Sequence, residues 1–315
     1  MSILRLEPAY KDFMWGGSVL KKEYGKSNYP GYVLAETWEL SADPDSPARI
    51  TNGEYRGVTF DKFVKENGAK ALGTNFDESK EFPITVKFID AHQNLSIKLH
   101  PSDTYADQHN LIKGNDECWY IMKALPNAGI FYGLERDLSK AEFEQRIRNN
   151  TLKDVIHFQV VKPGEVYFSG PGLLHSIGAG VVAAEVKQAK QVKYRVYDYG
   201  RVQPDGTPRP LSIEEAVEAA NLKAGAPQYN FKPHLVDCSK FILDEIEIEG
   251  EVTLSTDGTS FHHLLFLDGD GVLISSGSDS RMEYVKGSSI VVTADHGEYR
   301  LKGRGLALLT SIKKM

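Results

Sequence analysis

Short alternations of apolar and polar positions dominate this chain and predict a mainly β protein. β-branched and aromatic residues recur in brief runs separated by Gly, Pro, Asn or Asp, which is typical of strands joined by turns. Such runs lie at residues 84–89, 119–122, 129–133, 158–161, 166–168 and 181–186. Short strands with regular turn signals favour a sandwich or barrel over alternating βαβ units.

Helical signals are fewer. Residues 139–147 and 212–220 each open with a serine that is followed three residues later by glutamate, the pattern of a capping box. In the first of them Phe143 and Ile147 lie four residues apart, on one face of a helix. Residues 59–64 are a third, shorter candidate. We therefore expect a β frame with helical insertions.

The character of the chain changes after Pro233. Residues 200–210 hold three prolines and an Asp-Gly pair, which predicts a loop. Beyond it, little helix signal remains, and strands separated by Gly, Asp and Ser turns are predicted at 242–248, 252–254, 263–267, 271–274, 289–293 and 306–310. We predict a catalytic domain over 1–235 and a smaller β-domain over 236–315.

Composition narrows the class of protein. The 315 residues are 41% hydrophobic and 25% charged, with a formal net charge of −6. This is an ordinary globular balance, and no basic stripe for a nucleic acid is visible. No apolar run is long enough to span a membrane, and residues 1–10 lack the apolar core of a signal peptide. Two distant cysteines, Cys118 and Cys238, favour a reducing cytoplasm.

Two histidines and a glutamate are the strongest chemical signal. His100, Glu117 and His175 each lie in a β-type setting, and two imidazoles with one carboxylate are a ligand set of catalytic zinc, with one position left for water or substrate. Pro101 ends the first of these strands and leaves His100 at its terminus. Spacing alone leaves open that each histidine is an ordinary hydrogen-bonded residue.

The chain resembles the type I phosphomannose isomerases, also called mannose-6-phosphate isomerases. Seven segments carry the likeness in the family's order: Trp15-Gly16-Gly17, Glu36-Thr37-Trp38-Glu39-Leu40-Ser41, Phe82 to Ala91, Ser96 to Pro101, Glu117 to Ile121, His175 to Gly178, and Tyr194 to Arg201. The resemblance implies a cupin-type jelly-roll barrel with helical insertions and a second, smaller β-domain. It also implies a zinc enzyme that interconverts two sugar phosphates, mannose 6-phosphate and fructose 6-phosphate.

Family roles carry over to individual positions. His100, Glu117 and His175 match the zinc ligands, Glu185 matches a site carboxylate, and Arg195 matches the active-site arginine. The resemblance also places Ser96 on the phosphate side. Lys87 and Trp15 are further candidate substrate contacts, and the alternative role for Trp15 is ordinary core packing. Glu185 is the candidate base for proton transfer between C2 and C1 through a cis-enediol, because a carboxylate can serve as a general base.

The chain departs from the family around this site. Lys98 stands where the family usually has a glutamine ligand, Asn115 replaces a lysine, and residues 187–193 have lost a Ser-Asp-Thr-Thr run. A protonated lysine cannot ligate a metal. One hypothesis is that Lys98 replaces the missing cation, pairing with phosphate or with an enediolate oxygen, so that it is catalytic. The alternative is a weak or inactive cupin paralogue that binds metal or sugar phosphate.

Overall fold

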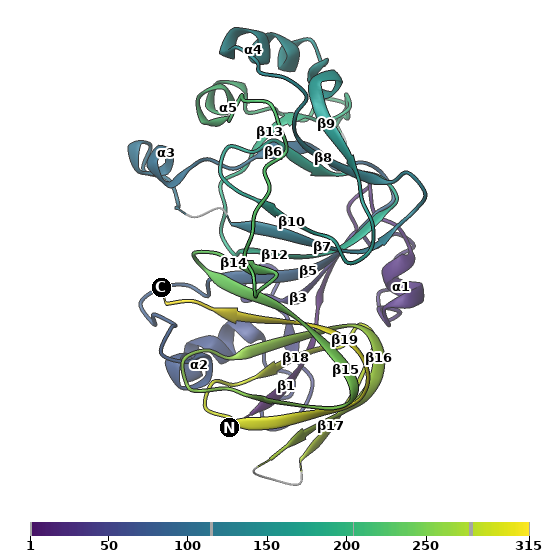
Figure 1. Cartoon of the computed structure of the whole chain (residues 1–315), viewed down its shortest axis with the longest axis vertical. Helices are drawn as coiled ribbons and strands as arrows, with labels where there is room; N and C mark the ends of the chain where they lie inside the picture. The colour runs from purple at the N-terminus through teal and green to yellow at the C-terminus, as the bar shows by residue number, and fades with distance from the viewer. Residues whose placement is uncertain (1, 114–115, 204, 277–279, 315) are drawn as a thin grey trace. The chain divides into compact units, whose positions relative to one another are not determined.

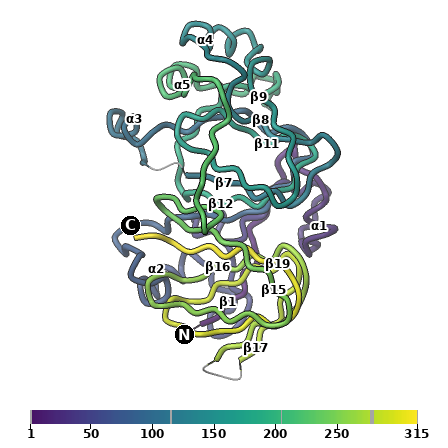
Figure 2. The backbone as a smooth tube through the Cα atoms, viewed as in Figure 1, coloured from purple at the N-terminus to yellow at the C-terminus, as the bar shows by residue number. Residues whose placement is uncertain are grey.

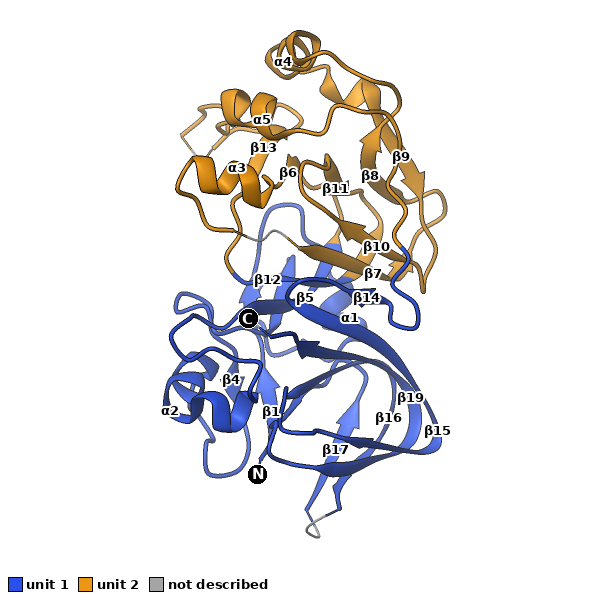
Figure 3. Cartoon of the chain, turned by 60° about the vertical axis from the view of Figure 1, so that its left-hand side comes forward, with its two compact units in different colours: residues 1–90, 184–189, 230–315 blue, residues 91–183, 190–229 orange. Residues whose placement is uncertain are grey.

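Strands form most of the structure, in two compact units (Figure 3). The computed structural model describes residues 2–113, 116–203, 205–276 and 280–314. The first unit comprises residues 1–90, 184–189 and 230–315, and the second comprises 91–183 and 190–229. These units cut the chain at other places than residue 235, so the predicted domain boundary stays a prediction. Within the described ranges, every helix is too short or too polar to cross a membrane.

The first unit contains an eight-stranded antiparallel sheet in the order β14–β15–β19–β16–β18–β1–β4, with β17 paired to β16 (Figure 1). Strands of this unit also form part of a six-stranded sheet, in the order β12–β5–β3–β2. The elements are β1 (Ile3–Glu7), β2 (Ala9–Lys11), α1 (Val19–Glu23), β3 (Glu36–Leu40), β4 (Arg49–Ile50), α2 (Phe60–Leu72), β5 (Ile84–Ala91), β12 (Val181–Gln188), which enters from the second unit, β14 (Val236–Asp237), β15 (Phe241–Ser255), β16 (His262–Ser275), β17 (Arg281–Val285), β18 (Ser289–Val292) and β19 (Glu298–Ile312).

Glycines explain why several predicted short strands are in fact long ones. The segments predicted at 242–248 and 252–254 join in β15, and those at 263–267 and 271–274 join in β16. Gly250 and Gly269 have positive φ within these strands, and a Cβ on Gly269 would lie 1.9 Å from the Arg304 carbonyl oxygen. Here glycine permits a bend and a close backbone approach instead of ending the strand. Figure 2 shows β15, β16 and β19 bending together.

A buried neutral histidine lies at the centre of this sheet. His263 in β16 is fully buried, and its Nε2 lies 2.9 Å from Ser289 Oγ. Ser289 donates its own hydrogen to the Glu39 carbonyl, so His263 Nε2–H is the donor to Ser289. Burial lowers the pKa of His263 to about 3. In the unfolded chain this histidine is protonated below about pH 6.5, whereas in the folded chain it stays neutral to a much lower pH.

This histidine makes folding stability depend on pH. Its contribution is complete above about pH 6.5 and is lost as the pH falls toward 3, with a slope of up to roughly 1.4 kcal/mol per pH unit. We expect urea unfolding between pH 7 and pH 4 to show this loss in the native chain, and a shallower slope in His263→Gln, which keeps a donor for Ser289. Equal slopes for the two proteins would contradict this assignment.

The second unit contains a five-stranded antiparallel sheet in the order β13–β6–β11–β8–β9, and its strands β10 and β7 pair in another sheet. Its elements are β6 (Ile97–Leu99), α3 (Asp103–Gln108), β7 (Glu117–Ala124), β8 (Gly129–Leu134), α4 (Lys140–Arg148), the 3-10 turn η1 (Leu152–Val155), β9 (Ile156–Val160), β10 (Val166–Ser169), β11 (His175–Ile177), β13 (Tyr194–Tyr197) and α5 (Ile213–Ala219).

One face of the five-stranded sheet is covered by helices. Phe143 and Ile147 of α4 and Ala216 of α5 pack with strand residues in one apolar cluster. The predicted helices at 139–147 and 212–220 are thereby confirmed. Ser139 accepts a hydrogen bond from the Glu142 amide at the start of α4, whereas Ser212 makes no such side-chain bond. The third predicted helix is longer than expected, because α2 continues to Leu72 through a kink at Gly68.

Candidate metal centre and active site

The three predicted metal ligands stand at the ends of strands in the second unit. His100 directly follows β6, Glu117 is the first residue of β7, and His175 is the first residue of β11. β6 and β11 are paired, with His175 opposite Lys98. Strand pairing therefore brings together side chains that are far apart in the sequence. All three ligand side chains are fully buried.

The distances within the triad suit a tetrahedral ion. Nε2 of His100 lies 3.3 Å from Glu117 Oε2, and Nε2 of His175 lies 3.5 Å from Glu117 Oε1. The ligand atoms of all three residues lie within 4.8 Å of one another. Two ligand atoms bound tetrahedrally to zinc at its usual bond lengths are about 3.3 Å apart. The predicted convergence of the three residues is confirmed.

Hydrogen bonds orient both imidazoles. His100 Nδ1 lies 2.7 Å from the Val192 carbonyl oxygen, and His175 Nδ1 lies 2.8 Å from the Leu173 carbonyl oxygen. A carbonyl only accepts, so each Nδ1 carries the hydrogen and each Nε2 of the neutral ring presents a lone pair to the triad. Burial lowers the pKa of His100 to about 4, which keeps this ring neutral near pH 7.

The two Nε2 atoms lack a hydrogen-bond donor. Both are buried, and among the described residues no hydrogen-bond partner reaches either of them. Each faces the Glu117 carboxylate, which also offers only lone pairs when ionised. Three lone-pair donors facing one another in a buried site are an arrangement that a cation stabilises. The residues therefore fit a divalent metal ion.

Lys98 supplies a positive charge to this site. Its Nζ lies 3.2 Å from Glu117 Oε1 and 3.1 Å from Oε2, and its side chain is 23% exposed whereas Glu117 is completely buried. Burial alone would raise the pKa of Glu117. The Lys98 ammonium and the two imidazoles outweigh burial and hold that pKa well below its usual value. Asn115, the other departure near the site, lies outside the described residues.

A row of polar side chains crosses the five-stranded sheet at Lys98. Arg195 of β13 pairs with Lys98, Lys98 pairs with His175, and His175 pairs with Tyr132 of β8. Directly paired residues project from the same face of a sheet. Ile97 and Leu99, which flank Lys98, point into the apolar cluster on the other face. Arg195 is half-buried, and its Nη1 donates to the Pro210 carbonyl at 3.3 Å.

Ser96 belongs to a separate polar group beside this row. Its hydroxyl donates to Asp198 Oδ1 at 2.8 Å. Asp198 also pairs with Arg209 at 2.9 Å and with Arg201 at 3.3 Å. Arg209 lies in the predicted loop and was missed by sequence reasoning, because nothing in the loop's composition indicates that it folds back to Asp198.

The remaining predicted site residues belong to the first unit. Lys87 Nζ lies 3.0 Å from Glu36 Oε2, 3.4 Å from Glu185 Oε2 and 4.4 Å from the centre of the Trp38 ring. All three charged side chains of this group are buried. Trp15 is also buried and stacks on Phe13, with 5.7 Å between ring centres. Sequence reasoning missed Glu36, although its motif was recognised.

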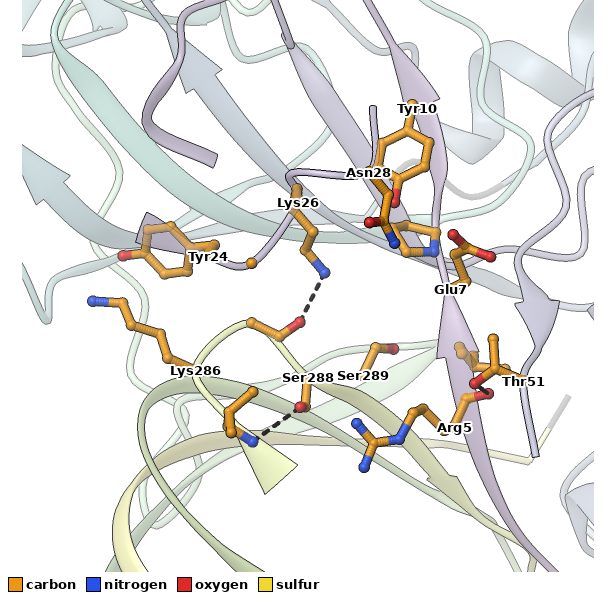
Figure 4. Close-up of a pocket in the computed structure, with 15 residues that line it drawn as sticks. Arg5, Glu7, Tyr10, Tyr24, Lys26, Asn28, Thr51, Lys286, Ser288 and Ser289 are labelled. Atoms are coloured by element: carbon orange, nitrogen blue, oxygen red, sulfur yellow. Dashed lines mark hydrogen bonds between the residues drawn. The ribbon is translucent and has the colours of Figure 1, made fainter. Parts of the chain in front are cut away.

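The first unit also contains a cavity of about 330 Å³. Figure 4 shows Lys26, Arg5 and Lys286 at its wall. Lys26 Nζ binds the Glu39 carboxylate at 2.8 Å and the Gly287 carbonyl at 2.7 Å. Arg5 donates to the Glu283 carbonyl, and Lys286 contacts Asp268 at 3.5 Å. Each of these cations already has an internal partner, so these three side chains do not mark an anion site.

Comparison with known proteins decides the family. Residues 3–124 match the model of the phosphomannose isomerase type I catalytic domain. The probable mannose-6-phosphate isomerase GmuF of Bacillus subtilis (strain 168) is 31% identical, over 95% of this chain and 96% of that protein. The chain belongs to the type I phosphomannose isomerase family. The mannose-6-phosphate isomerase ManA of the same organism is 29% identical, over 95% of this chain and 96% of that protein.

Solved structures agree with this family membership. The crystal structure of the mannose 6-phosphate isomerase from Bacillus subtilis superposes with a TM-score of 0.87 at 29% identity, covering 98% of this chain and 99% of that one. A zinc-bound mannose 6-phosphate isomerase has the same fold, with a TM-score of 0.78 at 16% identity over the full length of both chains. The predicted mainly β, cupin-type fold with helical insertions is confirmed.

Proposed function

We propose that this phosphomannose isomerase family member interconverts mannose 6-phosphate and fructose 6-phosphate, with a zinc ion held by His100, Glu117 and His175. The observation that carries the proposal is the buried triad, in which a carboxylate and two Nε2 atoms converge at metal-ligand distances, and neither Nε2 has a hydrogen-bond partner in the described part of the chain. Curated relatives named mannose-6-phosphate isomerases support the choice of reaction. The chain has two cysteines, Cys118 and Cys238, too few for a disulfide framework, which agrees with a reducing compartment such as the cytoplasm.

The reaction moves a proton between C2 and C1 through a cis-enediol. When bound, zinc supplies positive charge that polarises or orients the sugar oxygens at these carbons. Glu185 is the proposed base that takes the proton and returns it, since a positioned carboxylate can act on both neighbouring carbons. Its contact with Lys87 fixes the orientation of the carboxylate. Burial of the reacting groups keeps water away from the enediol.

Positive side chains are proposed to bind the anionic parts of the substrate. Arg195 presents a planar guanidinium suited to phosphate or to paired sugar oxygens. Lys98 lies beside it in the same row and is proposed to stabilise charge on an enediolate oxygen or on phosphate. Ser96, Lys87 and Trp15 remain the proposed substrate contacts from the sequence.

A second candidate function is a weak or inactive paralogue that binds metal or sugar phosphate. The contact of Lys98 with both oxygens of Glu117 favours it, because this ammonium occupies lone pairs that a metal needs. Measured turnover of mannose 6-phosphate distinguishes the isomerase from the inactive paralogue. The same assay with a panel of sugar phosphates tests other substrates, which the residues named above do not exclude.

The proposed function is tested by measuring the metal content and the isomerase activity of the same purified sample. We expect the purified chain to contain close to one zinc ion per molecule, to isomerise mannose 6-phosphate, to lose this activity with a chelator and to regain it with zinc. Lys98→Gln should then lower kcat; an unchanged or higher kcat removes Lys98 from catalysis. Zinc binding without turnover of any sugar phosphate would favour the paralogue.

A further inference from the structure

We infer that Lys98 is a built-in competitor of the metal ion. Its ammonium neutralises Glu117 in the metal-free chain and must leave the carboxylate when a divalent cation binds. The inference rests on the proposed function only in taking zinc as the ion. It predicts that this chain binds zinc less tightly than its three ligands alone would allow.

The contacts around Glu117 carry the inference. The ammonium lies 3.1 and 3.2 Å from the two carboxylate oxygens, and the Nε2 atoms lie 3.3 and 3.5 Å from the same two oxygens. A cation that these nitrogens ligate would therefore share the carboxylate with an ammonium already bound to it. Two cations this close repel each other strongly in a buried site. The ion pair and the metal complex therefore exclude each other.

The fold lets Lys98 leave without disturbing the strand. Ile97 and Leu99 anchor β6 through the apolar cluster on the opposite face, so the backbone at residue 98 stays in place when the side chain moves. The Lys98 side chain is 23% exposed, whereas the side chain of Glu117 is completely buried. The ammonium thus lies on the solvent side of the triad, on a flexible four-carbon stem. Displaced from Glu117, it remains on the sheet face that also carries Arg195.

Competition has two consequences of opposite sign. Removing the ammonium leaves the buried Glu117 charge without its cation, which destabilises the metal-free chain. The same change removes the competitor and tightens zinc binding. A lysine that only packed against the site would weaken stability and would not raise affinity, so the combination distinguishes competition from a structural role.

The experiment measures zinc affinity by titration against a chromophoric chelator, together with thermal unfolding with and without zinc. Lys98→Leu removes the charge and adds no ligand atom, and it should lower the zinc Kd at least tenfold. It should also lower the Tm of the metal-free chain and enlarge the rise in Tm that zinc produces. Lys98→Arg keeps the charge and should stay within about threefold of the native Kd. Lys223→Gln is the matched control, because it breaks an exposed pair with Asp137 in the same unit.

If metal-free Lys98→Leu fails to fold, the inference can still be tested on the native chain by measuring how fast Lys98 is acetylated with and without zinc. Lys98 should acetylate slowly without zinc, because its ammonium is held by Glu117, and severalfold faster in the zinc-loaded chain. Labelling is read by peptide mass spectrometry, with Lys223 as the internal reference. Lys98 labelling that zinc leaves unchanged contradicts displacement.

The outcomes separate this inference from the proposed function. A native chain that binds zinc with the same Kd as Lys98→Leu overturns the inference and leaves the isomerase proposal standing. A native chain that fails to bind zinc while Lys98→Leu binds it supports competition and overturns the zinc-dependent isomerase. Absence of binding by both proteins overturns both.

Discussion

Glu117→Gln is expected to lower kcat/KM for mannose 6-phosphate by about a thousandfold or more and to remove bound zinc. A neutral amide binds zinc more weakly than a carboxylate does. A catalytic metal lowers the activation free energy by several kcal/mol, and each 1.4 kcal/mol corresponds to roughly tenfold in rate. The substitution preserves the volume of the buried side chain. Metal content by mass spectrometry and steady-state kinetics on the same sample measure the effect.

Glu135→Gln is the matched control for this prediction. Glu135 also contacts a histidine, with 2.9 Å between its Oε1 and His157 Nδ1, but its side chain is 56% exposed. We expect activity within about twofold of the native chain, because exposed ion pairs contribute little. Full activity of Glu117→Gln with zinc still bound would show that the triad is not the metal centre.

Lys26→Met is expected to lower the free energy of unfolding by about 3 kcal/mol. Lys26 and Glu39 are both buried, and the ammonium lies 2.8 Å from the carboxylate. Removing one partner of a buried pair leaves an uncompensated charge. Burial already raises the pKa of Glu39 against the opposing effect of Lys26, so the variant takes up a proton at Glu39 more readily. Urea unfolding at pH 7 measures the loss.

The double variant Lys26→Met with Glu39→Gln should recover a large part of this stability, because it removes both buried charges. Lys80→Met is the exposed control in the same unit. Its pair with Asp77 measures 3.1 Å, with side chains 51% and 38% exposed, and we expect a loss below about 1 kcal/mol. An equal loss for Lys26→Met and Lys80→Met would show that burial of the pair contributes nothing.

Sequence reasoning identified the residues that converge, because strand ends carry their own signals. Pro101 predicts that His100 stands at the end of a strand, and the structure confirms it, because His100 directly follows β6. The helices at 139–147 and 212–220 were predicted from capping and spacing. The resemblance to a known family is what predicted that His100, Glu117 and His175 form one site.

Contacts between distant segments could not be predicted in the same way. Nothing in the sequence shows that Lys98 reaches both oxygens of Glu117, since this depends on where a flexible side chain rests after strands pair. The joining of predicted strands into β15 and β16 was missed because a glycine within a long bent strand has the same local signature as a turn. The pairing of Ser96 with Asp198 likewise depends on the pairing of β6 with β13.

The carbonyl that orients His100 belongs to Val192, inside residues 187–193, the segment that has lost the family's Ser-Asp-Thr-Thr run. A main-chain oxygen is the same in every amino acid. Evolution could therefore rewrite the side chains of residues 187–193 and still hold the imidazole in place, provided that the path of the backbone was kept. The amino-acid differences in residues 187–193 therefore overstate how much the support of the His100 imidazole has changed.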